Sequence, residues 1–154
     1  MPLSSTRLLL LAVVLLFPAL ATGQDDEWPP LSYLKSDYKS VAVVAHVNIR
    51  DAEITSRIVG YENWKVTCEV VESYKGKFRK GEVFEYFHGA EAGFKKEYFT
   101  GEKIVFLLSS RQSGMPEFKY TVLENSTLPY TESRAKKLRT IQRSYSKGGK
   151  SKKT

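Results

Sequence analysis

Five stretches rich in apolar and aromatic residues occupy the middle of the sequence, and they constrain the fold more than any other feature. In residues 41–49 every second side chain is valine, alanine or isoleucine, a period of two that predicts a β-strand with one buried face. His46 and Asn48 fall on the opposite face. Four further strands are predicted, at residues 64–74, 82–88, 103–108 and 118–123. Glycine-containing turns separate the strands, so the sequence predicts a small antiparallel barrel or sandwich.

Helical patterns flank the strands. Residues 34–40 can form one helical turn at the end of a lead-in segment, residues 24–40. Residues 131–145 place apolar side chains along one helical stripe opposite lysine and arginine, although Arg134 falls inside the apolar arc. We therefore expect one domain over residues 41–145, a barrel with a C-terminal helix packed on it. A disordered basic tail is expected over residues 146–154.

The first residues predict export. Arg7 precedes a continuous apolar run at residues 8–17, and small residues follow, as in a secretory signal peptide. Ten helical residues are too short to cross a hydrocarbon core of about 30 Å, so a membrane anchor is disfavoured. We expect residues 1–23 to be removed after Gly23, with Ala21 as the alternative cleavage site. No transmembrane segment is then expected, and the protein would be secreted or periplasmic.

Charge is divided unevenly along the chain. Residues 134–154 hold nine basic and no acidic residues, whereas residues 24–133 hold 14 basic and 17 acidic residues. A basic run of this kind attracts polyanions, and the simpler alternative is a solubilising tail without a partner. The candidate polyanion-binding residues are Lys136, Lys137, Arg139, Arg143, Lys147, Lys150, Lys152 and Lys153.

Residues that carry catalysis or hold metals are sparse. Cys68 is the only cysteine, so it can form no internal disulfide, and its phase in the second strand predicts a buried, inert thiol. An intermolecular disulfide is the alternative. His46 and His88 are the only histidines and lack metal-ligand spacing, so we expect two partly exposed strand histidines, with a meeting across strands as the alternative. The sequence predicts no catalytic residue, no metal and no cofactor.

Aromatic side chains leave two interpretations open. Barrels of the OB type bind oligonucleotides or sugars on an exposed sheet face, and Trp64, Tyr86 and Tyr120 are the candidates for such stacking. The alternative is that they belong to the core. No specific nucleic-acid partner is expected. Residues 125–127 form an N-glycosylation sequon, which matters only in a eukaryotic secretory pathway.

The order of these signals resembles the exported TIMP-like or netrin-module proteins. The most specific piece is residues 66–81, a strand followed by a Lys-Gly turn, a loop and a glycine before the next strand, and residues 99–107 support it. The resemblance implies a mainly β fold, a five-stranded OB-fold-like Greek-key barrel with a helix against it. Inhibitors of this family chelate a protease's zinc through an N-terminal cysteine. Here the only cysteine is Cys68, so that residue does not carry over.

These features together predict an exported, non-catalytic binding or interaction module of OB/TIMP-like type. The partner is left open between a protein and an extracellular polyanion. Two alternatives remain. One is a protease inhibitor that acts through the barrel loops, and the other is a polyanion or cell-surface binder that acts through the basic C-terminal tail. Salt distinguishes them, because screened charge contacts weaken as ionic strength rises.

Overall fold

The structure is a computed structural model that describes residues 28–148. All five predicted strands are present in it, and so are the two predicted helices at either end. A short α-helix that was not predicted lies between the last two strands. The elements follow in the order α1 (Leu31–Ser40), β1 (Val43–Ile58), β2 (Tyr61–Lys75), β3 (Val83–Glu91), η1 (Lys96–Tyr98), β4 (Glu102–Ser109), α2 (Ser110–Ser113), β5 (Tyr120–Pro129) and α3 (Glu132–Gly148). The predicted signal peptide lies outside the described residues.

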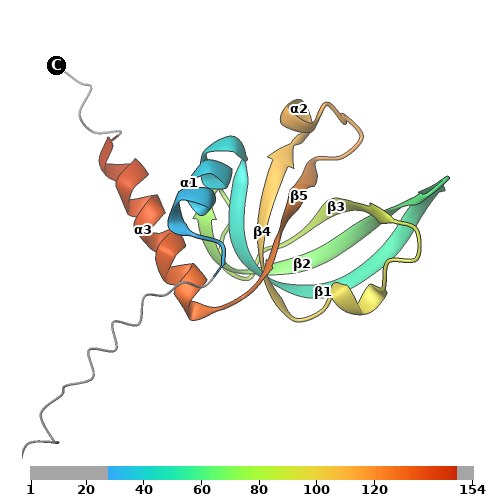
Figure 1. Cartoon of the computed structure of the whole chain (residues 1–154), viewed down its shortest axis with the longest axis horizontal. Helices are drawn as coiled ribbons and strands as arrows, with labels where there is room; N and C mark the ends of the chain where they lie inside the picture. Colours follow the sequence, from blue (N-terminus) through green and yellow to red (C-terminus); the bar gives the residue numbers. More distant parts are fainter. Residues whose placement is uncertain (1–27, 149–154) are drawn as a thin grey trace, which may run out of the picture.

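The strands form a closed barrel in the order β1-β2-β3-β5-β4 (Figure 1). Four of the five neighbouring pairs are antiparallel. The fifth pair, β3 with β5, is parallel and joins the strands only at Phe87 and Thr121. A closed five-stranded barrel with this order and a C-terminal helix fits an OB-like fold, which confirms the predicted fold class.

Strand β1 is long and repeatedly bent. Its pairing with β2 shifts register at four places, between Val44 and Ala45 and again further along, and such bulges increase local twist. The bends let one strand pair with both β2 and β4, which closing a small barrel requires. At the far end the chain reverses through Val59 and Gly60, and the φ of Gly60 is 83°, a conformation that favours glycine.

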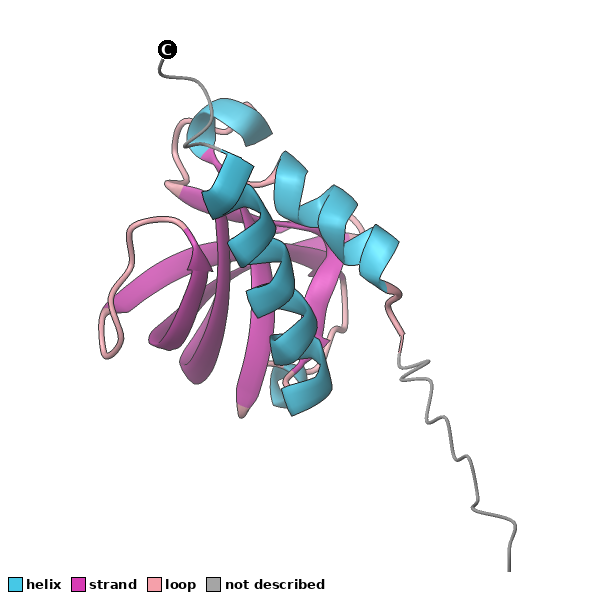
Figure 2. Ribbon diagram, turned by 90° about the vertical axis from the view of Figure 1, so that its left-hand side faces the viewer, coloured by secondary structure: helices cyan, strands magenta, loops and turns pink. Residues whose placement is uncertain are grey.

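The apolar side chains form two cores. One fills the barrel and includes Val43, Val47 and Leu107. The other lies between the outside of the barrel and the helices, and it includes Val44 and Phe106. Figure 2 shows α1 and α3 together on one side of the strands. Alternate residues of β4 therefore enter different cores, which accounts for the unbroken apolar run at residues 104–108 of the sequence.

The second core corrects the expectation for His46. The period-two pattern placed this residue on a polar face, yet it is only 4% exposed. Its imidazole stacks on Tyr130, with ring centroids 3.8 Å apart and planes 8° apart. Its Nε2 lies 3.4 Å from Glu102 Oε2. Burial lowers the pKa of His46, and this effect outweighs the nearby Glu102 carboxylate, which raises it. The helices supply the cover that a strand pattern alone does not reveal.

Both terminal helices are longer than the sequence pattern predicted. Helix α1 begins directly after Pro30 and buries Leu34 and Tyr38, one turn apart on the same face. Proline is compatible with the start of a helix, so the two prolines before α1 do not interrupt it. Helix α3 continues to Gly148, three residues into the segment expected to be disordered, and the rest of that segment lies outside the described residues. No helix within residues 28–148 is long and apolar enough to cross a bilayer.

Candidate functional site

The barrel is least complete between β3 and β5. After the single pair of Phe87 with Thr121, both strands continue without pairing to one another. On its other side β5 is also partly unpaired with β4. Val122 pairs with Leu107, and the next paired residue of β5 is Thr127, opposite Val105. Strand β5 thus bulges over residues 123–126. A groove with a volume of about 660 Å³ opens along this seam.

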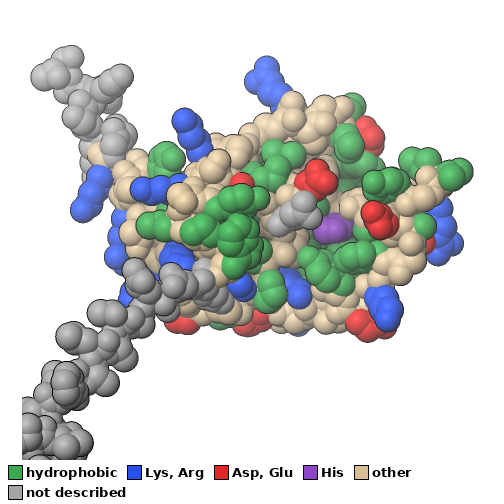
Figure 3. All heavy atoms as spheres, in the orientation of Figure 1, with side chains coloured by type: hydrophobic (Ala, Val, Ile, Leu, Met, Phe, Trp, Pro, Cys, Tyr) green, Lys and Arg blue, Asp and Glu red, His purple; other side chains and the backbone are tan. Residues whose placement is uncertain are grey.

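Aromatic rings line much of the groove. Phe87 of β3 stacks on Phe118, with ring centroids 3.8 Å apart, and Phe94 meets the edge of Tyr98 at 4.8 Å. Tyr98 also fastens η1 to the opposite strand, because its hydroxyl donates to the carbonyl oxygen of Thr127 at 3.3 Å. Figure 3 shows hydrophobic side chains around the hollow and a histidine side chain within it.

Three polar atoms of the groove residues are buried without a hydrogen-bond partner in the described part of the chain. They are His88 Nδ1, Thr121 Oγ1 and Thr127 Oγ1. Thr127 as a whole is only 8% exposed. A buried polar group without a partner costs about 1–3 kcal/mol, so folded proteins keep few of them. Four further atoms of this kind among residues 28–148 lie outside the groove, on His46, Trp64, Tyr86 and Ser133. The three in the groove adjoin an open space, where a ligand would supply the missing partners.

His88 is held neutral in this environment. Burial lowers its pKa to about 4, because desolvation disfavours the charged imidazolium. Aromatic rings surround it, with Phe99 edge-on at 5.1 Å and Phe94 at 5.9 Å between ring centroids. At neutral pH it therefore offers one donor and one acceptor rather than a positive charge.

The two histidines do not meet. His46 pairs with Glu72 across β1 and β2, whereas His88 pairs with Trp64, near the other end of β2. His46 lies under the helices and His88 lies in the groove. Among residues 28–148 no three His, Cys, Asp or Glu side chains gather in a way that could hold a metal ion.

Charge in the groove is acidic. The charged residues that line it are Glu91 and Glu124, both exposed, and no lysine or arginine lines it. Neither carboxylate has an ion-pair partner within residues 28–148. The two side chains therefore leave a negative charge at the rim of an apolar groove.

The predicted stacking residues lie elsewhere. Trp64 and Tyr86 are 4% and 0% exposed and belong to the barrel core, so the core interpretation is confirmed for them. Tyr120 is partly buried and packs beside Phe78 and Phe84. The aromatic residues that do line the groove come from separate segments, and no local sequence pattern unites them.

The outer surface of the barrel carries alternating charges instead of aromatic rings. Lys65 lies 2.5 Å from Glu53 and 3.8 Å from Glu85, so one ammonium group joins β1, β2 and β3. Arg50 forms an ion pair with Glu69 on the same sheet. These strand carboxylates thus lie beside basic side chains on the outer surface of the barrel, in exposed pairs that add little to stability.

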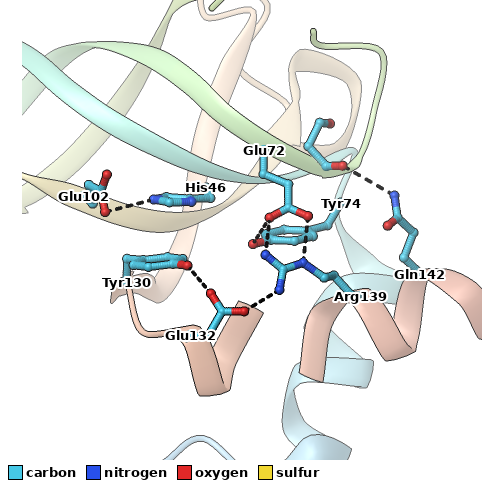
Figure 4. A network of polar contacts seen from close by, with 9 residues as sticks. His46, Glu72, Tyr74, Glu102, Tyr130, Glu132, Arg139 and Gln142 are labelled. Carbon is cyan, nitrogen blue, oxygen red and sulfur yellow. Dashed lines mark hydrogen bonds and ion pairs between the residues drawn. The ribbon is translucent and has the colours of Figure 1, made fainter. Parts of the chain in front are cut away.

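Arg139, one of the predicted polyanion-binding residues, points toward the barrel rather than toward solvent. Its Nε lies 2.9 Å from Glu72 Oε1 and its Nη2 lies 2.7 Å from Glu72 Oε2 (Figure 4). A third contact joins Nη1 to Glu132 Oε1 at 2.5 Å. Hydrogen bonds to Glu72 and Glu132 raise the pKa of Arg139, and the hydrogen bond from Arg139 lowers the pKa of Glu72. Its guanidinium is thus engaged within the protein.

The other predicted polyanion-binding residues are differently placed. Lys136, Arg143 and Lys147 are exposed on α3, and Lys137 is partly buried. Three more, Lys150, Lys152 and Lys153, lie outside the described residues. Polyanion binding by this set stays a prediction.

Cys68 lies in the barrel core, as its phase in the strand predicted. Its side chain is fully buried, and burial raises the pKa of the thiol to about 12. A thiol in this state is neither a nucleophile nor accessible to a second molecule, which argues against an intermolecular disulfide in the folded protein.

No family model matches the sequence, and no curated protein matches it significantly. The fold class and the groove therefore carry the functional argument, and the resemblance to TIMP-like proteins stays a proposal.

Proposed function

We propose that the chain is an exported, non-catalytic binding module of the OB-like type, and that its ligand occupies the β3–β5 groove. The observation that supports this most directly is the set of buried, unpartnered polar atoms in an aromatic groove. Ligand sites combine apolar walls with a few placed polar groups in this way. A ligand that donates to or accepts from these atoms would remove a desolvation cost that the free protein bears.

The chemistry of the groove favours binding over catalysis. A general base works best when its pKa lies near the working pH, and His88 has its pKa lowered to about 4. Carboxylates that could assist it, Glu91 and Glu124, stand exposed at the rim. His88 is therefore better suited to orient a ligand through hydrogen bonds than to transfer protons.

Thr127→Val tests the proposal, because valine matches threonine in shape and removes the unpartnered hydroxyl. The probes are indole and p-cresol, neutral aromatic molecules with one polar group, followed by amide chemical shifts of the isotope-labelled protein. We expect shifts to cluster around His88, Thr121 and Thr127, and affinity to fall about fivefold in the variant. Protein made in bacteria avoids any effect of the sequon at residues 125–127.

The matched control is Thr67→Val on the outer face of β2, opposite Glu85 and away from the groove. It should leave probe binding unchanged. Shifts scattered over the surface, or equal affinity in wild type and Thr127→Val, would contradict the proposed site. Export is tested separately by N-terminal sequencing of secreted material, which should begin after Gly23 or Ala21.

A second candidate function is supported by the exposed side of α3. Lys136, Arg143 and Lys147 face solvent there, and the chain contains no acidic residue after Glu132. A solvent-exposed basic surface binds polyanions through charge contacts that salt weakens. Protease inhibition through the barrel loops also stays a prediction. A panel of secreted proteases assayed with the full chain would test it.

A further inference from the structure

We propose that the groove binds an extended, basic peptide segment of a partner protein, which adds as a strand to the free edge of β3. This inference rests on the proposed function, because it assigns a ligand class to the same groove. It depends on three independent features: an open backbone edge, a glycine that the fold does not need, and acidic side chains at the rim.

The backbone edge follows from the hydrogen bonds between β2 and β3. Val70 N donates to Glu82 O at 2.9 Å, and Ala92 N donates to Gly60 O at 3.0 Å. In an antiparallel pair alternate residues bond to the partner strand, so even-numbered residues of β3 bond to β2. The backbone groups of Gly89 and the N–H of Glu91 therefore face away from β2.

Among residues 28–148 no strand pairs with that side of β3 beyond Phe87. The parallel pairing with β5 ends at Phe87 and Thr121, and both Gly89 and Glu91 line the groove. Unpaired backbone N–H and C=O groups at a strand edge are a template for another strand. An extended peptide can pair there and satisfy them, which is the usual mode of strand addition.

Gly89 is the second feature. It sits inside β3, and a Cβ at this position would meet only Asn63 Oδ1, at an ordinary contact distance of 3.6 Å. The described fold therefore has room for a side chain here. Glycine weakens a strand interior and often marks a place where another backbone approaches closely. Because a paired strand lies in the plane of the sheet, the space above Gly89 would be occupied by a side chain of the incoming peptide, and this explains why a larger residue is absent.

The third feature selects the chemistry of the peptide. Glu91 and Glu124 stand at the rim, whereas Phe87, Phe118 and Tyr98 form apolar walls and Thr127 offers an unpartnered hydroxyl. A peptide strand points alternate side chains to opposite faces. Phe87 and Glu91 lie on the same face of β3, so lysine or arginine on that face of the peptide would lie near the carboxylates. Apolar side chains on the other face of the peptide would fill the groove beside Tyr98.

The experiment uses three fluorescent nine-residue peptides and the full chain. In the first, lysine alternates with valine and phenylalanine. The second replaces lysine by glutamate, and the third replaces the central valine by proline, which removes a backbone donor. Fluorescence anisotropy should show that the basic peptide binds about tenfold more tightly than either of the others. Equal affinity for the basic and acidic peptides, or no effect of proline, would overturn the proposal.

Gly89→Val provides the decisive variant. Valine favours strands, so the midpoint of thermal unfolding should stay the same or rise, while affinity for the basic peptide should fall about tenfold. Thr67→Val places a valine on the outer face of β2, away from the groove, and this variant should bind the basic peptide like wild type. If Gly89→Val binds the peptide normally, the strand-addition model is wrong.

A charge-reversed variant keeps the test informative should Gly89→Val not fold. Replacing both rim carboxylates by lysine (E91K with E124K) should invert the preference, so that the acidic peptide binds more tightly than the basic one. An unchanged preference contradicts the proposal. A dimer of the free protein that Gly89→Val dissociates would identify a second copy as the occupant, and would overturn it as well.

The two proposals fail separately. Indole or p-cresol binding at His88 and Thr127 without any peptide binding would retain the groove as a ligand site and remove the peptide. Peptide binding that maps outside the groove would remove the strand-addition proposal alone, whereas probe binding that maps outside the groove would remove both.

Discussion

Arg139 of α3 and Glu72 of β2 are joined by two parallel hydrogen bonds, and this pair connects the C-terminal helix to the wall of the barrel. Tyr74 donates to the same carboxylate at 3.1 Å, and Glu132 accepts from both Arg139 and Tyr130. The helix is thus positioned by a planar fork of donors in addition to its apolar stripe.

Arg139→Lys should lower the free energy of unfolding by about 1 kcal/mol, because lysine cannot reproduce the two-pronged contact. The estimate is modest because both side chains are about one-third exposed, 33% for Arg139 and 34% for Glu72. Urea unfolding followed by circular dichroism measures it. Arg143→Lys, an exposed change on the same helix, is the control. Equal losses in the two variants would show that the pair does not stabilise the fold.

Stability should fall as the pH is lowered through the range set by His88. Its pKa is about 4 in the folded protein and 6.5 when exposed, so between these values the unfolded chain binds a proton that the folded chain does not. The loss is about 0.4 kcal/mol at pH 6.5 and should reach about 2 to 3 kcal/mol by pH 4.5. His46, whose pKa is also lowered by burial, adds to it in the same direction.

His88→Gln isolates this contribution. The variant lacks the titrating group, so its unfolding free energy should change less between pH 7 and pH 4.5 than that of wild type. His46→Gln should remove only the remaining part. A wild-type curve that is flat over this interval would contradict the neutral state of His88.

Cys68 should not react with thiol reagents in the folded protein. Its side chain is fully buried, and the pKa of about 12 leaves almost no thiolate at pH 8. Ellman's reagent should therefore label the protein at the rate at which it unfolds, and stoichiometrically in urea. Fast labelling without denaturant would place the thiol outside the core.

Binding to a polyanion should depend on the exposed residues of α3 and not on Arg139. Replacing Lys136, Arg143 and Lys147 by glutamine should lower the salt concentration that elutes the protein from heparin. Arg139→Gln should elute close to wild type, because its guanidinium already pairs with Glu72 and Glu132. If wild type does not bind heparin at low salt, the α3 surface is only a solubilising one.

The elements with a strong period were predictable from the sequence. Alternation in β1 and the continuous run in β4 located these strands, and the spacing of Ala135, Leu138 and Ile141 located the buried side of α3. The phase of Cys68 with its apolar neighbours placed it in the core. In each case the periodicity of the apolar residues within one segment was enough to predict the element and its buried side. Residues that are neighbours along the chain share the same environment there.

Features that depend on a second layer or on a seam were not predictable. His46 lies on the face of β1 opposite the barrel core. It is buried only because the helices and Tyr130, which are distant in the sequence, pack over that face. The groove unites His88 of β3 with Thr127 of β5 and Phe94 of the intervening loop. A periodic pattern describes one element at a time, so it contains no information about where two distant strands part.

The single bridge between Phe87 and Thr121 also has a dynamic consequence. Regions held by few backbone hydrogen bonds open locally at a lower free energy than the rest of the domain. Amide hydrogens near this bridge should exchange with solvent sooner than those in the middle of the β1–β2 ladder. A peptide strand can then enter by separating β3 from β5 at this bridge while both cores remain assembled. Peptide binding would therefore not require global unfolding.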